Sequence, residues 1–403
     1  MSRQDTLKEK IDTLRASIVY RMPIVWDTLP VKPDEEIKLF YGKPGDAHCL
    51  DIAHPTEDQL QRLEAACERA TFGRNQEDVL DETYRKAGKM DTSNLSTNFS
   101  PPPSFLGHVR DELLQRHDTR LVYELYKLNV YGKDAFFKPH KDTPRGPSSY
   151  GTLIVVFPAP HTGGELIFSD PKHGEWIVDA AAHILPTNGA PNLVLRRLLR
   201  RRHARDGLPD AGPPLPVVLD YDAGPRAALS SLLAESRLLP HGGYLGFGLR
   251  YEYPVSERSK LQPYHLKGGD SMIWRVCQAL GLDVSIVYLY GMESNKDLQY
   301  PLNKREDASF VTTSAVDLGG AGNDDLGDEF TDAPVIRDAG TPCVLGPDDE
   351  KHEEFEVVWV TEHLKKNRLE ELFVALGNDA YIDAMYGTVA LFIKMKPRLQ
   401  DEQ

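Results

Sequence analysis

The segment that most constrains this chain is a strand-like run followed by a His-x-Asp triplet. Residues 121–131 combine β-branched and aromatic side chains with partial alternation, and Gly132 ends the run. Residues two apart on an extended segment point to the same face, so His140 and Asp142 can direct an imidazole and a carboxylate at one point. One histidine from another strand would complete the 2-His-1-carboxylate arrangement that holds non-haem Fe(II) and leaves positions open for a co-substrate and O2.

A His-x-Asp triplet is also compatible with a histidine and an aspartate on a solvated loop, so its surroundings decide. The triplet ends the pattern Tyr-x4-Phe-Phe-x-x-His-x-Asp, which begins at Tyr131. An apolar strand-like run follows at 151–157, and a Gly-Gly-Glu-Leu hairpin sequence follows at 163–166. The residues that carry this arrangement are Tyr131, Phe136, Phe137, His140, Asp142, Gly163, Gly164, Glu165 and Leu166.

This arrangement resembles the Fe(II)/2-oxoglutarate-dependent dioxygenases of the prolyl-4-hydroxylase-like superfamily. Residues 71–85 and 238–254 also resemble a mostly fungal group of these enzymes. The resemblance implies that His140 and Asp142 are iron ligands and that Tyr131 contacts the co-substrate. It further implies Fe(II), 2-oxoglutarate and O2, with ascorbate as a reductant. Peptidyl proline, another protein side chain and a small metabolite remain open as substrates, and the oligomeric state is also open.

The fold expected from strand spacing and from this resemblance is α+β and mainly β. Its core is a double-stranded β-helix, or jelly roll, at 119–255. A helical N-terminal region at 1–118 supports one sheet, and 256–403 forms a smaller α+β extension with an acidic loop at 317–330. We expect helices at 5–19, 57–70, 105–116, 270–281 and 361–375, and further strands at 284–290, 355–360 and 387–394.

Residues 193–224 depart from the family pattern where the second metal histidine belongs. The resembled enzymes have aromatic-Val-Ala-Phe-Tyr-x-Asp-x-x-His-Glu there, followed by a basic residue that binds the distal carboxylate of 2-oxoglutarate. This chain instead has six arginines between 196 and 205, followed by a Gly- and Pro-rich segment. The interior of a barrel core cannot bury so many cations, so we expect 193–224 to be poorly packed.

Three interpretations of this arginine run compete: a basic nucleic-acid or localisation patch, an inserted surface helix, or a shifted reading frame. We favour the shifted frame. With CTN codons for leucine and CGN codons for arginine, the next frame from Val194 permits Ser-Tyr-Val-Ala-Phe-Tyr-Ala-Asp-Val-Thr-His-Glu. The restored histidine straddles the codons of Ala204 and Arg205, beside but distinct from His203, which is the weaker candidate for the third ligand. The chain as written is then impaired; a catalytically inactive jelly-roll binding or scaffold protein is the alternative.

Charge and composition limit the remaining possibilities. The net charge of −14 disfavours nucleic acid and anionic membrane as partners. The charged N-terminus has no apolar stretch typical of a signal peptide, and no run is long and apolar enough to span a membrane. The four cysteines are far apart, which predicts neither a zinc site nor a disulfide framework. These features favour a reducing compartment, cytoplasmic or nuclear.

Overall fold

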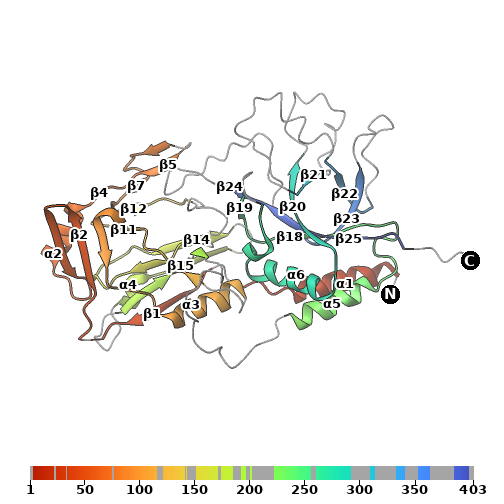
Figure 1. Cartoon of the computed structure of the whole chain (residues 1–403), viewed down its shortest axis with the longest axis horizontal. Coiled ribbons are helices and arrows are strands. Elements are labelled where there is room, and N and C mark those ends of the chain that lie inside the picture. Colours follow the sequence, from red (N-terminus) through yellow and green to blue (C-terminus); the bar gives the residue numbers. More distant parts are fainter. Residues whose placement is uncertain are drawn as a thin grey trace, which may run out of the picture.

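The small sheets of the first half of the chain and the barrel of the second half lie side by side in this computed structural model (Figure 1). Its elements are mixed α and β. The residues that the structure describes are 3–21, 24–32, 34–74, 77–115, 121–140, 142, 151–170, 174–184, 192–196, 200–201, 222–255, 260–291, 309–313, 333–340, 353–363 and 385–398.

Short sheets make up the first half. Three of them have three strands, in the orders β3-β2-β9, β11-β8-β4 and β1-β16-β13. Their bounds are β1 Trp26–Pro30, β2 Lys38–Lys43, β3 Asp46–Asp51, β4 Glu68–Arg69, β8 Gly88–Asp91, β9 Leu95–Thr97, β11 Lys127–Val130, β13 Ile154–Val156 and β16 Asn192–Arg196. Two-stranded pairs complete this half: β5 Phe72–Arg74 with β6 Glu77–Val79, β7 Arg85–Lys86 with β12 Phe136–Phe137, β10 Leu121–Val122 with β17 Arg200–Arg201, and β14 Leu166–Asp170 with β15 Gly174–Val178.

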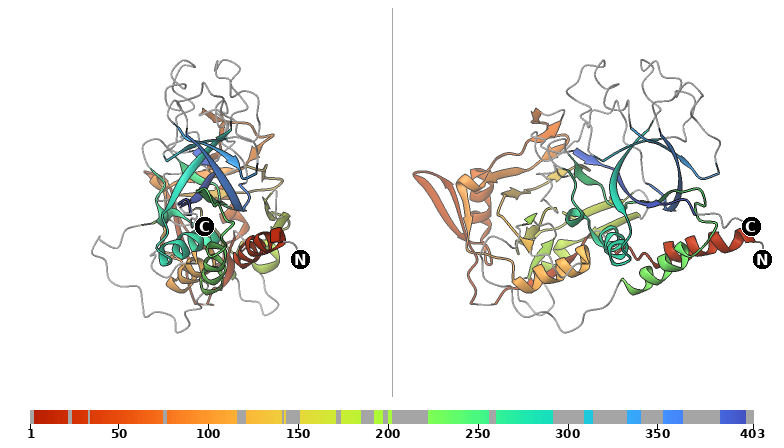
Figure 2. Two further views of the ribbon diagram at one scale, coloured as in Figure 1. Left: turned by 90° about the vertical axis from the view of Figure 1, so that its right-hand side faces the viewer. Right: turned by 45° about the vertical axis from the view of Figure 1, so that its right-hand side comes forward.

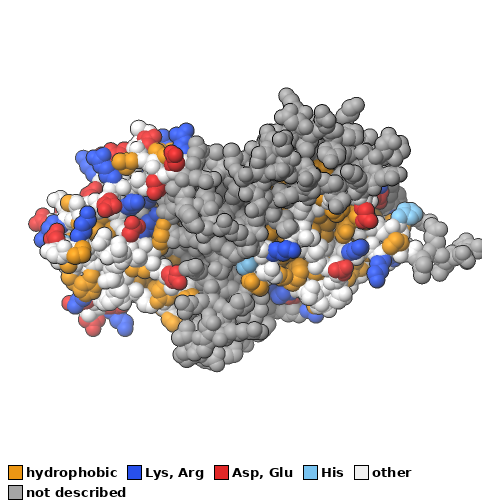
Figure 3. Space-filling model, turned by 45° about the horizontal axis from the view of Figure 1, so that its top comes forward, with side chains coloured by type: hydrophobic (Ala, Val, Ile, Leu, Met, Phe, Trp, Pro, Cys, Tyr) orange, Lys and Arg blue, Asp and Glu red, His pale blue; other side chains and the backbone are white. Residues whose placement is uncertain are grey.

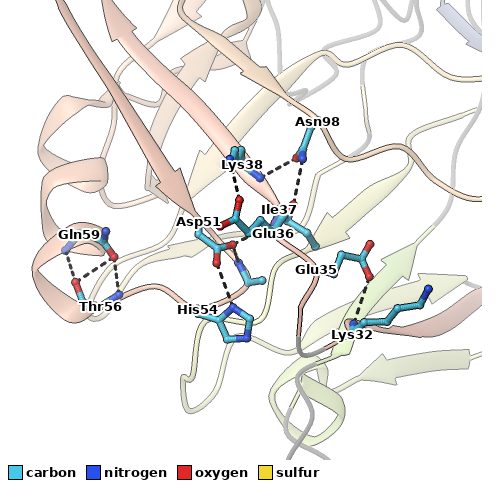
Figure 4. A network of polar contacts seen from close by, with 11 residues as sticks. Lys32, Glu35, Glu36, Ile37, Lys38, Asp51, His54, Thr56, Gln59 and Asn98 are labelled. Carbon is cyan, nitrogen blue, oxygen red and sulfur yellow. Dashed lines mark hydrogen bonds and ion pairs between the residues drawn. The ribbon is translucent and has the colours of Figure 1, made fainter.

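Helix α2, Glu57–Ala66, shows how local sequence sets these elements. Thr56 and Gln59 form a reciprocal capping box at its start, which satisfies backbone N–H groups that the first turn leaves open (Figure 4). The helix ends before the expected residue 70 because Glu68 and Arg69 pair with β8 as β4. Helix α3, Pro103–Val109, continues into a π-helical turn at Arg110–Leu114, and the short helix α4 spans Ala180–Ile184.

A six-stranded closed barrel dominates the second half, in the order β18-β23-β22-β21-β20-β25 (Figure 2). Strand β25 is buried on both faces of the barrel wall. Val389, Leu391 and Ile393 belong to one apolar cluster, and Ala390 and Phe392 belong to another. A continuous apolar run is typical of a strand that is buried on both faces. The strands are β18 Gly243–Gly248, β20 Val284–Gly291, β21 Ser309–Thr312, β22 Val335–Asp338, β23 Glu354–Thr361 and β25 Val389–Met395, and β19 Tyr253–Val255 pairs beside them with β24 Met385–Gly387.

Three helices cover one side of this barrel: α1 Arg3–Ser17, α5 Ala223–Leu233 and α6 Gly268–Ala279. Leu14 and Ile18 at the end of α1 are buried in one cluster with Leu245 and Phe247 of β18. An ion pair of 3.3 Å between Lys10 and Glu235 adds to the packing of α1. The N-terminal helix therefore supports the barrel of the second half, where β18 lies, and not the half of the molecule that contains His140.

Asp270, in the first turn of α6, joins that helix to the chain after β18. Its carboxylate is fully buried and accepts hydrogen bonds from the backbone N–H groups of Arg250 at 3.0 Å and Tyr251 at 3.1 Å. The hydroxyl of Tyr253 donates a third bond of 2.8 Å. Burial raises the pKa of Asp270 from 3.8 to about 6, although these hydrogen bonds and Arg250 oppose the shift.

The long periodic elements agree with the sequence predictions. Helices α1, α2, α3 and α6 and strands β20, β23 and β25 occupy the predicted segments to within a few residues. The predicted strand at 121–131 is wrong as one element, because Leu121–Val122 and Lys127–Val130 pair in different sheets. The predicted helix at 361–375 and the acidic loop at 317–330 lie almost wholly or wholly outside the described residues.

The barrel does not coincide with the predicted 119–255 core. Only β18 of its strands comes from that segment, and the predicted boundary at 255 divides the barrel. Strand β23 is parallel to both β18 and β22, whereas a jelly roll is antiparallel. The jelly-roll core at 119–255 stays a prediction.

The poor packing expected at 193–224 stays a prediction, but the backbone at the start of that segment pairs in sheets. Strand β16 is the central strand of its sheet, with β1 on one side and β13 on the other. Arg200 and Arg201 pair with β10, and α5 begins at Ala223. Residues 202–221, including His203, lie outside the described part of the chain.

Among the described residues, none of the helices has the length and apolar character needed to cross a membrane. On the face in Figure 3, basic and acidic side chains of the described residues are interspersed over the small sheets.

Candidate metal centre

The imidazole of His140 and the carboxylate of Asp142 face each other in the first half of the molecule. Nε2 of His140 lies 3.8 Å from Oδ1 of Asp142, and the two side chains retain 23% and 34% of their accessible surface. Two bonds of about 2.1 Å to a shared metal reach at most roughly 4.2 Å, so one metal can span this separation, at a wider angle than the roughly 90° of a facial site. The predicted pair is thus brought together and remains partly open to solvent.

The ring of His140 is held in one orientation by its own loop. Nδ1 lies 2.9 Å from the carbonyl oxygen of Lys138, which can only accept, so Nδ1–H donates and Nε2 carries the lone pair. Burial lowers the pKa of His140, with Arg85 and Lys127 acting in the same direction, while the Lys138 carbonyl and Asp142 oppose them. The neutral imidazole that a metal requires is therefore favoured.

Thr152 orients Asp142, a relationship that the sequence did not reveal. Its hydroxyl donates a hydrogen bond of 2.6 Å to Oδ2 of Asp142, which leaves Oδ1 as the oxygen facing His140. Thr152 lies two residues before Ile154, the first residue of β13, so the adjoining sheet carries this support. Such outer contacts orient metal ligands and tune their affinity.

Phe137 forms the wall of the site behind His140. Its ring stacks on the imidazole with a centroid distance of 3.5 Å and an interplanar angle of 18°. On β12, Phe137 lies opposite Arg85 of β7, and the guanidinium carbon of Arg85 sits 4.4 Å from the phenyl centroid. Tyr84 meets the same phenyl ring edge-on and donates a hydrogen bond of 2.5 Å to the carbonyl of Pro139.

Tyr131 follows β11 directly and lies close to this group. Half of the residue is exposed (50%), so Tyr131 is not a packed core tyrosine. Burial around the hydroxyl raises the pKa of Tyr131, Asp142 adds to the rise, and Arg85 lowers it through its charge and a hydrogen bond. The hydroxyl is therefore protonated at neutral pH and can donate a hydrogen bond.

The described residues supply two metal ligands of the predicted three. No group of three or more His, Cys, Asp and Glu side chains suited to a metal occurs in the described part of the chain. His203 is outside it. Strand β16 nevertheless leads toward the site, because Arg196 at its end pairs with Ile154, two residues after Thr152.

A second His–Asp pair, His54 and Asp51, has a structural role. His54 Nδ1 lies 3.1 Å from Oδ2 of Asp51, whose Oδ1 accepts backbone N–H groups from Ile37 and Ala53, each at 3.1 Å (Figure 4). Both carboxylate oxygens of Asp51 are thus engaged in joining strand ends. In contrast, Oδ1 of Asp142 faces a histidine nitrogen at a distance too long for a hydrogen bond.

Comparison with known proteins gives no match to a protein family, to a curated protein or to a solved structure.

Proposed function

We propose that this protein descends from, and in its in-frame form is, an Fe(II)- and 2-oxoglutarate-dependent dioxygenase of the prolyl-4-hydroxylase-like type. The observation that carries the proposal is the pair of donor atoms, Nε2 of His140 and Oδ1 of Asp142, that face one another beside Tyr131. An imidazole and a carboxylate suit non-haem iron, which takes one more histidine in this type of site. The sequence pattern around the pair supports the same assignment.

When bound, iron with 2-oxoglutarate and O2 supplies the oxidising chemistry: 2-oxoglutarate loses CO2 to become succinate, and a C–H bond of the substrate is hydroxylated. The chain's own part is binding and orientation. His140 and Asp142 hold the metal, while Thr152 and the Lys138 carbonyl fix the orientation of those two ligands. The protonated hydroxyl of Tyr131 donates a hydrogen bond to the co-substrate.

The third ligand in this proposal comes from the segment after β16. In the shifted frame it is the histidine across the codons of Ala204 and Arg205; His203 is the weaker candidate. The proposal also includes a jelly-roll core at 119–255 and a reducing compartment, cytoplasmic or nuclear, which keeps iron ferrous. The substrate class stays open among peptidyl proline, other protein side chains and small metabolites.

Metal binding by the present chain is the first test. We expect weak binding of Fe(II) or Co(II) under anaerobic conditions, and we expect His140→Ala and Asp142→Ala each to abolish it. His161→Ala is the matched control, because His161 Nδ1 makes the same kind of bond, 2.7 Å to the carbonyl of Ala159 two residues earlier. His54→Ala tests a histidine that already has an aspartate partner. Retained metal stoichiometry in His140→Ala or Asp142→Ala would refute the assignment.

Turnover of 2-oxoglutarate to succinate, with Fe(II) and ascorbate, separates the enzyme from the alternative. The in-frame chain should produce succinate without added substrate, and His140→Ala in that chain should not. A correctly folded in-frame chain that neither binds metal nor produces succinate would favour an inactive binding or scaffold protein.

A further inference from the structure

We infer that Arg85 is a positioning residue for the candidate metal centre. Arg85 holds the His140 ring through Phe137 and orients the Tyr131 hydroxyl. The inference rests on the proposed function, because His140 is a metal ligand only if that proposal holds. It adds a residue that lies outside the His-x-Asp segment and comes from β7, in the N-terminal part of the chain.

Among the described residues, Arg85 is the largest fully buried side chain, with 1% of its surface exposed. Burying a guanidinium is costly unless its donors are used, and here they tie separate segments together. Nη1 donates to the carbonyl of Thr71 at 2.6 Å, and Nη2 donates to Oδ1 of Asn129 on β11 at 2.9 Å. The fixed, planar fork of arginine can make both bonds at once, which the single ammonium of lysine cannot do in the same geometry.

The fixed guanidinium is linked to His140 through the Phe137 ring, against which both groups lie. The guanidinium lies over one side of the Phe137 ring at 4.4 Å, and the imidazole of His140 stacks on that ring at 3.5 Å. The pairing of β7 with β12 sets Arg85 opposite Phe137 at the backbone level. A displaced phenyl ring would leave the imidazole without the surface that fixes its tilt.

The neighbouring residue strengthens this connection. Tyr84 bonds to the Pro139 carbonyl, and the Lys138 N–H donates to the Tyr84 carbonyl at 3.1 Å. The short loop before His140 is therefore held by β7 at the backbone, while Arg85 holds the ring behind the imidazole. Arg85 also hydrogen-bonds the Tyr131 hydroxyl, so one side chain contacts both sides of the candidate centre.

Proton NMR of the metal-free protein tests the geometric part. His140 ring protons lie over the Phe137 phenyl and should resonate upfield of ordinary histidine protons, with the assignment taken from their loss in His140→Ala. We expect Phe137→Leu to remove this upfield shift and Arg85→Met to reduce it, with part of it recovered in Arg85→Lys. The matched control is Arg69→Met, since the Arg69 side chain on β4 is 72% exposed and should leave the His140 signals unchanged.

Co(II) affinity tests the functional part without requiring turnover. Arg85→Met and Phe137→Leu should each weaken Co(II) binding by roughly 10–100-fold, the range typical of outer contacts to metal ligands. The double variant should lose little more than either single variant, because both act through one stack. Phe137→Leu keeps the buried arginine, so the stack can be tested even where Arg85→Met does not fold.

The outcomes separate the two ideas. If neither the wild-type chain nor the in-frame chain binds Co(II), the proposed function fails, and the His140 ring shifts still decide whether Arg85 positions that ring. If a folded Arg85→Met variant keeps the wild-type ring shifts and the wild-type Co(II) affinity, the positioning role is refuted. Additive losses in the double variant would also refute it, because they would mean that the two residues act separately.

Discussion

Thr152 and Asp142 are joined by a hydrogen bond of 2.6 Å, in which the threonine hydroxyl donates to Oδ2 and leaves Oδ1 facing His140. This bond selects one of two equivalent carboxylate oxygens for the candidate metal. It also connects the loop that carries Asp142 to the start of a sheet strand.

Thr152→Val should therefore weaken metal binding while preserving the fold, because valine keeps the shape of threonine but has no hydroxyl. We expect Co(II) affinity to fall by roughly 10–100-fold, measured by anaerobic titration. Thr13→Val is the control, since the Thr13 hydroxyl bonds only within helix α1, to the Glu9 carbonyl. Equal affinities in the Thr152→Val and wild-type proteins would show that the hydroxyl does not orient the ligand.

Stability should depend on pH through Asp270. Its pKa is raised from 3.8 to about 6 in the folded protein, so the folded state holds the proton more tightly than the unfolded chain. The contribution of Asp270 to the free energy of unfolding is therefore fully present below about pH 4, and it is lost as pH rises through about 6. A shift of about two pKa units corresponds to a loss on the order of 3 kcal/mol.

Other carboxylates titrate in the same range, so the difference between wild type and Asp270→Asn is the quantity to measure. Asparagine cannot ionise. It does, however, have only one of the two side-chain oxygens with which Asp270 accepts three hydrogen bonds. Urea unfolding at several pH values should show the wild type losing stability relative to Asp270→Asn between pH 4 and 7. A constant difference across that range would contradict the raised pKa.

Arg337 should contribute to the stability of the barrel. It bridges Glu354 at 2.6 Å and Glu356 at 2.7 Å across the parallel pair β22 and β23, and its side chain is only 17% exposed. Arg337→Met removes the cation shared by the nearly buried Glu354 carboxylate and the partly exposed Glu356 carboxylate, and should cost less than the roughly 3–5 kcal/mol of a fully buried pair. Lys38→Met, which breaks the exposed ion pair with Glu36, should leave the urea midpoint nearly unchanged.

The shifted frame makes the sharpest genetic prediction. Sequencing the transcript across the codons of 192–225 should reveal a single-base change near Asn192 and a return to frame before about Pro225. The corrected chain should turn over 2-oxoglutarate, whereas the present chain should be inactive or nearly so. A transcript that confirms every base, together with a normal rate from the present chain, would show that His203 or another residue completes the site.

Local sequence predicted the elements that local sequence controls. Helix α1 has an amphipathic pattern, and strands β20 and β25 are long apolar runs. All three elements formed where we expected them. The run at 121–131 is rich in strand-forming residues, interrupted by Glu124, Lys127 and Asn129, yet its two ends pair with different partners, β17 and β8. Pairing partners are remote in sequence, so propensity could not predict the break.

The same limit applies to the candidate site. The spacing of His140 and Asp142 on one segment was enough to expect them together, because two positions on an extended chain share a face. Arg85 and Thr152 reach them only through nonlocal contacts, the pairing of β7 with β12 and a loop-to-strand hydrogen bond. Arg85 did lie in a stretch singled out by resemblance, but nothing in the sequence distinguishes a buried arginine from a solvated one.

The position of helix α1 has a consequence for how this protein is made. Leu14 and Ile18 are buried against strands that begin at Gly243, so the first helix leaves the ribosome long before its partners exist. Its apolar face must stay solvent-exposed or find temporary cover during most of synthesis. Contacts between such distant segments slow folding, because a long loop must close before they can form. The barrel half of the molecule therefore completes its packing only when both ends of the chain are present.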